Sequence, residues 1–519
     1  MTAAEPTPAA PVRGRFLGNV VANLANFALQ IVIGIWFTPY LIRHIGTAAY
    51  GLVPLAYQVT DYMKIATMAL NSAVGRYLTL ALSTGDERQA NRVFNTSLGG
   101  TFAVGAILMP FAFIFAFHAD KLIHVPADLV TDARWLFVCT SVMFFMTTFA
   151  SPFEVVSYCR NRFDLRNGVL MTSQIVRVGI VIAMFMVFPP RLAFVGIGLV
   201  GAGMLTLLGA LAIWRALGPE LRVEPGSFDR SMLRDLTAMG GWSVVNQVGT
   251  ILFLYIDLLV INLLLGAEAA GRYATALQWS MMLRGLAGAI AGVFGPTILA
   301  LYARNEMTDL IEYSRRSVRL VGVTMALPIG LVCGLSRPLL SRWLGPEFVS
   351  QALLMSLLTG HLCINLAYLP LQTLPTAANR VRWPGLASLA MGGANLALAL
   401  ILAGPMHWGP YGVAAAGAIV LSAKNILFTP IYGAHVIGQP KTTFLRELVP
   451  IPIVTAIIAG AAWMLSSRLD LATWPRLFVA GCGFGMFYLP LAWLVVLRRQ
   501  DRELVRERLT AVVARFRRA

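Results

Sequence analysis

Three basic side chains fall in the middle of long apolar segments, where an ionised group is costly. Lys64, Arg284 and Lys424 each follow the start of a predicted membrane-spanning segment by 12 or 13 residues. At about 1.5 Å per residue, this spacing places them near the middle of a bilayer. A charge there costs about 2.5–3.5 kcal/mol even on the most lenient insertion scale. Because Lys and Arg bind phosphate well, the three cations predict a cavity for an anionic substrate.

Acidic side chains also lie within these segments. Asp61, Glu154 and Asp257 are candidates for binding Na⁺ or H⁺ and so for coupling transport to an ion gradient; no cofactor or metal is otherwise expected. Asp61 precedes Lys64 by three residues, so a local ion pair between them is an equal alternative. Glu154 and Arg177 lie toward the cytoplasmic ends of their segments, which favours snorkelling to the membrane surface.

Polar side chains recur at helical spacing on five segments, which predicts five polar helix faces. The faces are Asn19, Asn23, Asn26 and Gln30; Tyr57, Asp61, Lys64 and Asn71; Thr147, Ser151, Glu154 and Tyr158; Ser243, Asn246, Thr250 and Asp257; and His361, Asn365, Tyr368 and Gln372. One such residue alone is better explained by a hydrogen bond between helices. Five faces together predict a shared wet cavity. The candidate substrate-binding residues are Lys64, Arg284, Lys424, Asn23, Asn26, Gln30, Asn246, His361 and Gln372.

Sequence motifs for catalysis are absent. The chain has no nucleotide-binding P-loop, no H-E-x-x-H metalloprotease motif and no G-x-S-x-G nucleophile motif. Its five cysteines are scattered without metal-ligand spacing. The polar connections are too short for a catalytic domain, so we do not expect an enzyme.

The composition defines a polytopic membrane protein. Of 519 residues, 57% are hydrophobic and 13% are charged, with a mean hydropathy of +0.71. Continuous apolar runs favour helices over a β-barrel, because a helix satisfies its own backbone within lipid. The expected fold is all-α with fourteen transmembrane helices, at 16–40, 52–75, 93–117, 134–158, 169–189, 193–214, 240–265, 272–300, 319–340, 351–376, 385–403, 411–436, 449–466 and 475–497.

Charge sets the predicted orientation. The net charge is +17, and basic residues are about threefold more frequent in loops on one side of the membrane. This side is the cytoplasm, so both termini are expected there, and nucleic acid is not an expected partner. The basic tail at 498–519 has helical apolar spacing and is expected to rest on membrane lipids.

An internal repeat divides the chain into two predicted lobes. Between positions 26 and 75, nine of fifty residues recur 220 positions later, among them Gly46, Gly51 and Gln58. The same offset pairs Arg160 with Arg380 and Arg162 with Arg382. Six spans per repeat give both lobes one orientation, as in transporters with a central site. The predicted parts are a cytoplasmic tail (1–15), an N-lobe (16–215), a linker (216–239), a C-lobe (240–436), two added helices (437–497) and the basic tail (498–519).

The segment from Phe37 to Gly51, followed by Val74-Gly75-Arg76-Tyr77, resembles the opening of Wzx-type oligosaccharide flippases. These belong to the MOP superfamily, together with MATE exporters and the lipid II flippase MurJ. The repeat and the two added helices are also similar to that superfamily. The first span carries an Asn/Gln face instead of the arginine–acid pair expected near the start of MurJ.

The resemblance implies a flippase of the bacterial inner membrane. It would move undecaprenyl-diphosphate-linked oligosaccharide from the cytoplasmic to the outer leaflet by alternating access, with Lys64, Arg284 and Lys424 receiving the diphosphate. A polysaccharide polymerase and other assembly proteins are the further partners it implies. Three alternatives stay open: a MATE-like drug exporter, which the basic cavity disfavours, a lipid II flippase, and a membrane scaffold for polysaccharide assembly.

Overall fold

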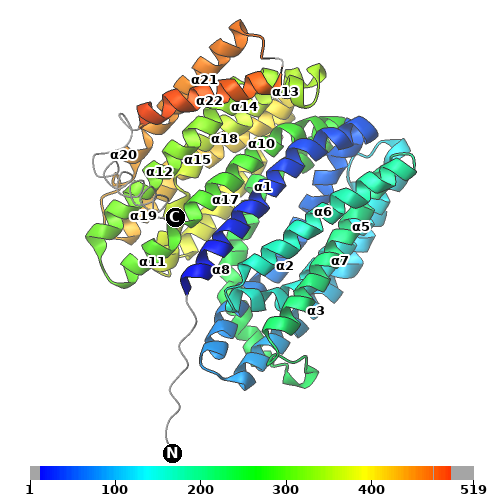
Figure 1. Ribbon diagram of the computed structural model, residues 1–519, viewed down its shortest axis with the longest axis vertical. Coiled ribbons are helices and arrows are strands. Elements are labelled where there is room, and N and C mark those ends of the chain that lie inside the picture. The colour runs from blue at the N-terminus through cyan, green and yellow to red at the C-terminus, as the bar shows by residue number, and fades with distance from the viewer. Residues whose placement is uncertain (1–11, 472, 493–519) are drawn as a thin grey trace, which may run out of the picture. The chain divides into compact units, whose positions relative to one another are not determined.

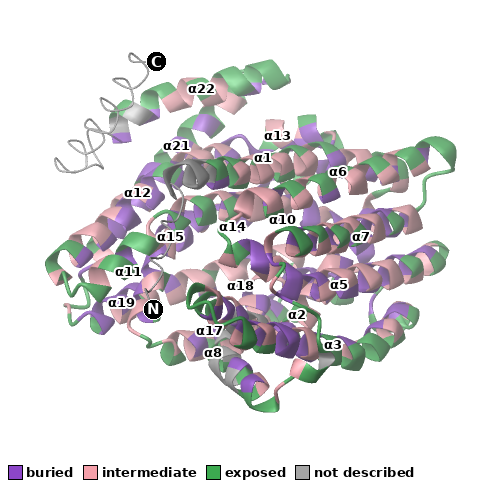
Figure 2. Cartoon of the chain, turned by 60° about the horizontal axis from the view of Figure 1, so that its bottom comes forward, coloured by how far each residue is buried: buried purple, intermediate pink, exposed green. Residues whose placement is uncertain are grey.

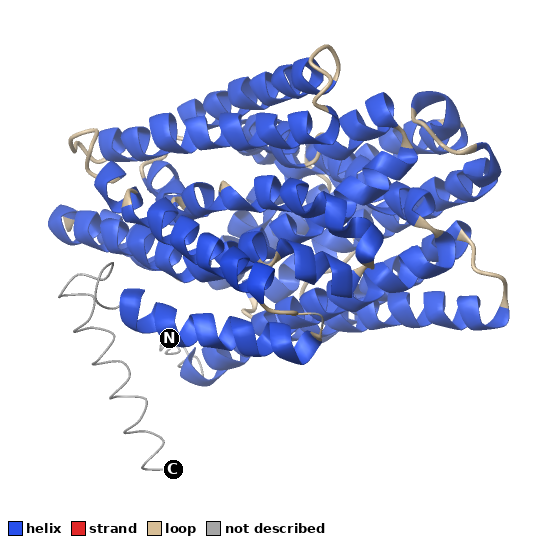
Figure 3. Ribbon diagram, turned by 90° about the horizontal axis from the view of Figure 1, so that it is seen from above, coloured by secondary structure: helices blue, strands red, loops and turns tan. Residues whose placement is uncertain are grey.

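The computed structural model describes residues 12–471 and 473–492. Within these ranges every regular element is a helix and no strand occurs, which confirms the all-α prediction (Figures 1 and 3). The basic tail at 498–519 and the first eleven residues of the predicted N-terminal tail lie outside the described residues.

The first half of the chain contains long helices joined by short turns. They are α1 (Val12–Ile45), α2 (Thr47–Ser83), α3 (Glu87–Phe117), α4 (Ala119–Leu122), η1 (Ala127–Leu129), α5 (Val130–Cys159), α6 (Phe163–Val187), α7 (Leu192–Leu217) and η2 (Pro225–Ser227). Local signals set their ends. For example, the Asp86 side chain accepts a hydrogen bond from the Gln89 N–H at 2.9 Å and so caps α3.

The second half contains more broken helices. They are α8 (Arg230–Leu254), α9 (Asp257–Leu265), α10 (Ala267–Gly292), α11 (Gly295–Ala303), α12 (Met307–Gly334), α13 (Ser336–Trp343), η3 (Pro346–Gln351), α14 (Ala352–Gly360), α15 (Leu362–Ala367), η4 (Leu369–Gln372), α16 (Thr373–Ala377), α17 (Arg382–Ala403), α18 (Gly409–Ala423), η5 (Lys424–Phe428), α19 (Thr429–Val436), α20 (Leu445–Leu448), α21 (Pro450–Arg468) and α22 (Trp474–Leu491).

These helices form two compact units. Among the described residues, unit 1 comprises 12–248 and 266–271, and unit 2 comprises 249–265, 272–471 and 473–492. The division therefore falls within α8 and again near the start of α10, whereas the sequence had placed a linker at 216–239.

In the described part of the chain, the predicted spans fall mostly on helices, some of them broken, but the number of fourteen is not confirmed. Eleven helices in the described part of the chain are long and apolar enough to cross a membrane. Counting the pair Val244–Leu254 and Asp257–Leu265, bent by 44°, as one span gives twelve. The helix α2, which carries Asp61 and Lys64, is not among them. The protein is a multi-pass membrane protein by this measure.

Exposed residues lie along many of the helices (Figure 2), and large apolar side chains are among them. Phe102 and Phe111 on α3 are about two-thirds exposed, and Phe487 on α22 is 83% exposed. Extended apolar exposure of this kind is unfavourable in water and is typical of a surface that faces lipid.

Backbone geometry supports the repeat at one turn and corrects it at another. Gly46 and Gly266, 220 positions apart, both adopt positive φ (81° and 88°) between consecutive helices. In the later turns, the N–H of Arg162 donates to Ser157 O and the N–H of Arg380 donates to Pro375 O. Each of these turns has an asparagine at positive φ just before the arginine, with Asn161 at 54° and Asn379 at 53°.

In these later turns, corresponding residues are therefore 218 positions apart instead of 220. The second repeat has two residues fewer than the first between its glycine turn and its asparagine turn. Arg162 corresponds to Arg380, and Asp164 corresponds to Arg382. The pairing of Arg160 with Arg380 inferred from a constant offset is wrong.

Two repeated glycines meet within unit 1. A Cβ atom on Gly51 of α2 would lie 2.6 Å from the backbone nitrogen of Gly271 and 2.7 Å from Ala267 O. A side chain does not fit at such a distance, so glycine is required where α2 meets the first residues of α10.

Unit 2 is organised around α12. This helix packs against α14, α15 and α21, and the Cβ positions of Gly330 and Gly334 lie against Ile458 and Ala462 of α21. Near the middle of α12, the buried side chain of Arg319 donates to the buried Glu447 carboxylate at 2.8 Å. Small residues and this ion pair hold α21 and the preceding connection to α12.

Candidate functional site

Unit 1 contains an open cavity of about 640 Å³ that is lined by residues of α2, α5, α6 and α7 and by Gln247 of α8. Its volume is within the usual range for small-molecule sites. The lining comprises Tyr57, Lys64, Thr67, Met68, Met143, Thr147, Thr148, Ser151, Glu154, Arg166, Leu170, Ser173, Gln174, Arg177, Leu199, Ala202, Gly203, Thr206 and Gln247.

The helix α2 brings Tyr57, Lys64 and Thr67 to the cavity. Their spacing of seven and three residues keeps them on one helix face. The Lys64 ammonium lies 2.7 Å from Asp61 Oδ1, and the two side chains are 55% and 28% exposed. The local ion pair that the spacing allowed is formed, and Lys64 still lines the cavity.

The helix α6 contributes two cations that the sequence analysis did not select as substrate ligands. Arg166, Ser173 and Arg177 line the cavity along one face of α6. Arg177 Nη1 donates to Tyr57 Oη at 2.5 Å, and its guanidinium lies 5.9 Å from the centre of the Phe37 ring. Arg177 thus points to α1 and α2 instead of snorkelling.

The helix α5 supplies the hydroxyl groups of Thr147 and Ser151 and the carboxylate of Glu154. Arg166 Nε donates to Glu154 Oε2 at 3.3 Å. Ser151, Glu154 and Arg166 also line a second cavity of about 440 Å³ that extends to Arg76 and Tyr158. The predicted polar faces of spans two and four therefore meet in one region.

The charge of this region is basic. Four cations line the two cavities (Lys64, Arg76, Arg166 and Arg177), and Glu154 is the carboxylate that lines them. Asp61 adds a second carboxylate through its pair with Lys64. The sequence did contain a signal for Arg166 and Arg177, because both share a helical face with Ser173. Their positions near predicted span ends favoured a place at the membrane surface instead.

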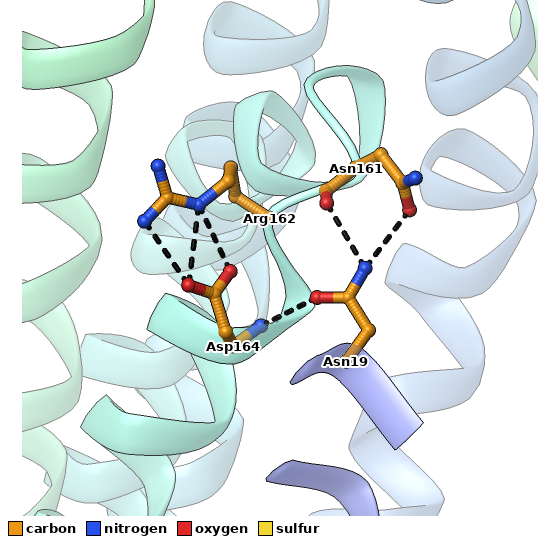
Figure 4. Close-up of polar contacts among 4 residues, drawn as sticks. All are labelled: Asn19, Asn161, Arg162 and Asp164. Carbon is orange, nitrogen blue, oxygen red and sulfur yellow. Dashed lines mark hydrogen bonds and ion pairs between the residues drawn. The ribbon is translucent and has the colours of Figure 1, made fainter. Parts of the chain in front are cut away.

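The asparagine face of α1 is used for helix packing. Asn167 of α6 donates to Asn23 Oδ1 at 2.7 Å and accepts from Asn26 Nδ2 at 3.3 Å. One turn earlier, the buried Asn19 donates to Asn161 O at 3.0 Å and accepts from the N–H of Asp164 at 3.0 Å (Figure 4). Further along α1, the predicted ligand Gln30 has an exposed side chain.

Unit 2 contains a separate buried cluster around Asp257. Asp257, Arg284 and His361 line a small cavity of about 20 Å³, enough for roughly one water molecule. Tyr273 donates to Asp257 Oδ2 at 2.9 Å. In the described part of the chain, Asp257 Oδ1, Arg284 Nε and His361 Nδ1 are buried without hydrogen-bond partners. The structure brings these three predicted residues together.

The remaining predicted ligands lie elsewhere. Lys424 begins the π-helical turn η5, where its ammonium donates to Ser388 Oγ at 2.8 Å and lies 5.1 Å from the centre of the Phe253 ring. Asn246 on α8 and Gln372 at the end of η4 have exposed side chains. None of the three lines the cavity around Asp257.

The chain is thus a helical multi-pass membrane protein with a basic cavity in unit 1. Comparison with solved structures supports this fold: the chain superposes on the lipid II flippase MurJ in an inward closed conformation with a TM-score of 0.65, at 14% identity, covering 93% of this chain and all of that one. It also superposes on an inward-facing MATE multidrug resistance transporter of the MOP superfamily with a TM-score of 0.58, at 16% identity, covering 81% and 98%.

Sequence comparison identifies the family. The polysaccharide biosynthesis protein family matches residues 16–301. The chain is 33% identical to the uncharacterized membrane protein EpsK of Bacillus subtilis strain 168, over 95% of this chain and 98% of that protein. It is 21% identical to a putative O-antigen transporter of Shigella flexneri, over 68% and 82%. This chain belongs to the polysaccharide biosynthesis protein family.

Proposed function

We propose that this protein moves a polyprenyl-diphosphate-linked oligosaccharide from the cytoplasmic to the outer leaflet of the bacterial inner membrane. The observation that carries the proposal is the basic, hydroxyl-rich cavity of unit 1. Organic cations, the usual cargo of drug exporters, suit a cavity of this charge poorly. A membrane flippase of a polysaccharide family requires a site that accepts both phosphate and sugar.

The cavity offers both kinds of contact. The guanidinium groups of Arg166 and Arg177 present planar pairs of donors, which match phosphate oxygens. Thr147, Ser151 and Gln174 present hydroxyl and amide groups to the same space and suit sugar hydroxyls. A diphosphate bound at the cations places the adjoining sugars against these neutral groups.

The ion pair between Lys64 and Asp61 is exchangeable. Because both side chains are partly exposed, the pair contributes at most about 1 kcal/mol. A diphosphate carries more charge than one carboxylate and competes with Asp61 for the Lys64 ammonium. Release of Asp61 then accompanies substrate binding.

Transport is proposed to proceed by alternating access and to be coupled to a Na⁺ or H⁺ gradient. The buried Asp257 with its unpartnered Oδ1 is the group best suited to take up the coupling ion, beside the Arg284 and His361 side chains. The ion would alter the charge of this cluster when it binds. Both termini are assigned to the cytoplasm by the loop charge bias, and a polysaccharide polymerase would receive the product.

Surface glycan export tests the proposal. In a strain whose chromosomal copy is deleted, the wild-type protein is expected to restore export, and the Lys64→Gln/Arg166→Gln variant is expected not to restore it at equal protein level. Normal export by this variant contradicts the cavity assignment. Restored drug resistance in a pump-deficient host, without effect on glycan, supports the exporter alternative instead.

A further inference from the structure

We propose that a hollow on unit 2, lined by Arg380, Arg382, Trp383, Phe428, Tyr432 and His435, is a docking site for the phosphorylated sugar end of the lipid-linked substrate. The proposal rests on the function proposed above. It adds a place where the substrate binds unit 2, apart from the cavity of unit 1 and from the cluster around Asp257.

The hollow has a volume of about 570 Å³ and is built by three segments: the turn after α16, the start of α17, and the η5–α19 stretch. The rings of Phe428 and Tyr432 stack with centres 5.2 Å apart and planes 10° apart. Tyr432 Oη donates to the Arg380 carbonyl at 3.0 Å, which fixes the ring beside the turn. The site is thus held together by ordered contacts.

The equivalent turn of unit 1 shows what differs here. There, Arg162 is paired with Asp164 at 2.9 Å, and this carboxylate holds the pKa of Arg162 above its ordinary value. Arg160 is likewise paired with Glu220. Both arginines of that turn are therefore neutralised by acids of the same unit.

In unit 2 an arginine takes the place of the acid in this turn. Arg382 occupies the position that corresponds to Asp164, two residues after Arg380. The position of Glu220 corresponds to Gly438 or Pro440, whichever offset is used, so neither register supplies an acid. Among the residues that the structure describes, Arg380 makes no ion pair, and its side chain is exposed.

These groups match a sugar linked to phosphate. Two guanidinium groups two residues apart provide several N–H donors for phosphate oxygens. The exposed Trp383 and half-buried Tyr432 add flat aromatic surfaces, against which the C–H face of a pyranose packs.

A phospholipid headgroup carries the same phosphate chemistry but lacks the sugar. We commit to the saccharide diphosphate, because the hollow combines two guanidinium groups with flat aromatic surfaces, and a phospholipid headgroup lacks the pyranose that packs against such surfaces. The loop charge bias places this turn on the cytoplasmic side, where the substrate is made. Docking at the hollow would concentrate substrate before it enters the transport cavity.

Binding to the full-length protein in nanodiscs of zwitterionic lipid tests the proposal. The probe is a short-chain polyprenyl diphosphate linked to a disaccharide, and phosphatidylglycerol and inorganic pyrophosphate are the competitors. Arg380→Gln/Arg382→Gln is expected to weaken probe binding about tenfold or more, and Tyr432→Ala several-fold. Lys441→Gln/Arg446→Gln, which removes two exposed cations of unit 2 outside the hollow, is expected to change it less than twofold.

Each outcome has one meaning. Equal binding by wild type and the Arg380/Arg382 variant overturns the docking site, as does an absence of probe binding to the wild type. If phosphatidylglycerol displaces the probe at concentrations equal to that of the probe, the hollow is a phospholipid site, and the proposed docking of the saccharide diphosphate is overturned. Flipping of the probe is measured separately, so a wild-type protein that binds but never flips it contradicts the proposed function while leaving the docking site in place.

Discussion

Lys64 and Asp61 form a salt bridge of 2.7 Å on one face of α2, at the wall of the unit 1 cavity. The pair allows the ammonium to remain charged before substrate arrives, because the carboxylate compensates it. It also sets a threshold, since the substrate must compete with a tethered acid for the same cation. A simple anion is a weaker competitor than a diphosphate.

The first prediction separates the two partners of this pair. Lys64→Gln is expected to lower the flipping rate about tenfold, whereas Asp61→Asn is expected to tighten substrate binding a few-fold because the ammonium is no longer occupied. Both should change the free energy of unfolding by less than about 1 kcal/mol, since the pair is partly exposed. Lys121→Gln, an exposed lysine of unit 1 outside the cavity, is the control. Weaker binding by Asp61→Asn would show that the carboxylate itself is needed.

The second prediction concerns the Arg177–Tyr57 hydrogen bond. Arg177→Gln removes a cavity cation, and the flipping rate is expected to fall about tenfold or more. Tyr57→Phe keeps the guanidinium but removes its acceptor, so a smaller loss of a few-fold is expected. Flipping rates in vesicles distinguish the two variants. The melting temperature in detergent shows whether each variant is folded. Identical losses in both variants would assign Arg177 to packing.

The third prediction tests ion coupling at the buried cluster. Asp257→Asn is expected to abolish the dependence of flipping on an imposed Na⁺ or H⁺ gradient, with substrate binding retained. Tyr273→Phe removes the hydrogen bond to the same carboxylate and should preserve gradient dependence. Flipping is measured with each gradient imposed alone and with both collapsed. A wild-type rate that ignores both gradients contradicts coupling altogether.

The fourth prediction addresses stability in unit 2. Glu447→Gln removes the buried carboxylate that faces the Arg319 guanidinium, while the partly exposed Glu312 remains 3.8 Å away, and it is expected to lower the free energy of unfolding by about 3–5 kcal/mol. Replacing both partners, as Arg319→Met/Glu447→Leu, is expected to recover most of that loss, because no charge remains buried. Thermal unfolding in detergent measures both. A double variant as unstable as the single one would show that the ion pair itself stabilises unit 2, beyond avoiding an unpaired buried charge.

The sequence predicted the class of fold because apolar length is a strong signal in membrane proteins. The turn glycines at positions 46 and 266 were also predictable, since their shared positive φ follows from one repeated sequence. The count of spans was less so, because a break such as that between α8 and α9 leaves hydropathy high on both sides. A constant repeat offset of 220 matched Arg162 to Arg382. The later turns differ by two residues, so the residue equivalent to Arg162 in the second repeat is Arg380.

The site was only partly predictable, since helical spacing shows which residues share a face but not what that face meets. The α2 and α5 faces meet at one cavity, whereas Asn23 and Asn26 of α1 bond to Asn167. Arg177 was misjudged because its distance from the span end suggested snorkelling, while its true partner, Tyr57, is 120 residues away. Contacts of that sequence separation have no local signal.

The central claim is that the basic cavity of unit 1 carries a lipid-linked oligosaccharide across the membrane. The most direct measurement is the flipping of a fluorescent polyprenyl-diphosphate-linked saccharide in vesicles that contain the purified protein. Wild type is expected to move the probe between leaflets, and Lys64→Gln/Arg166→Gln/Arg177→Gln is expected to fall to the rate of empty vesicles while remaining folded. Wild-type flipping by the triple variant, or none by the wild type, would contradict the account.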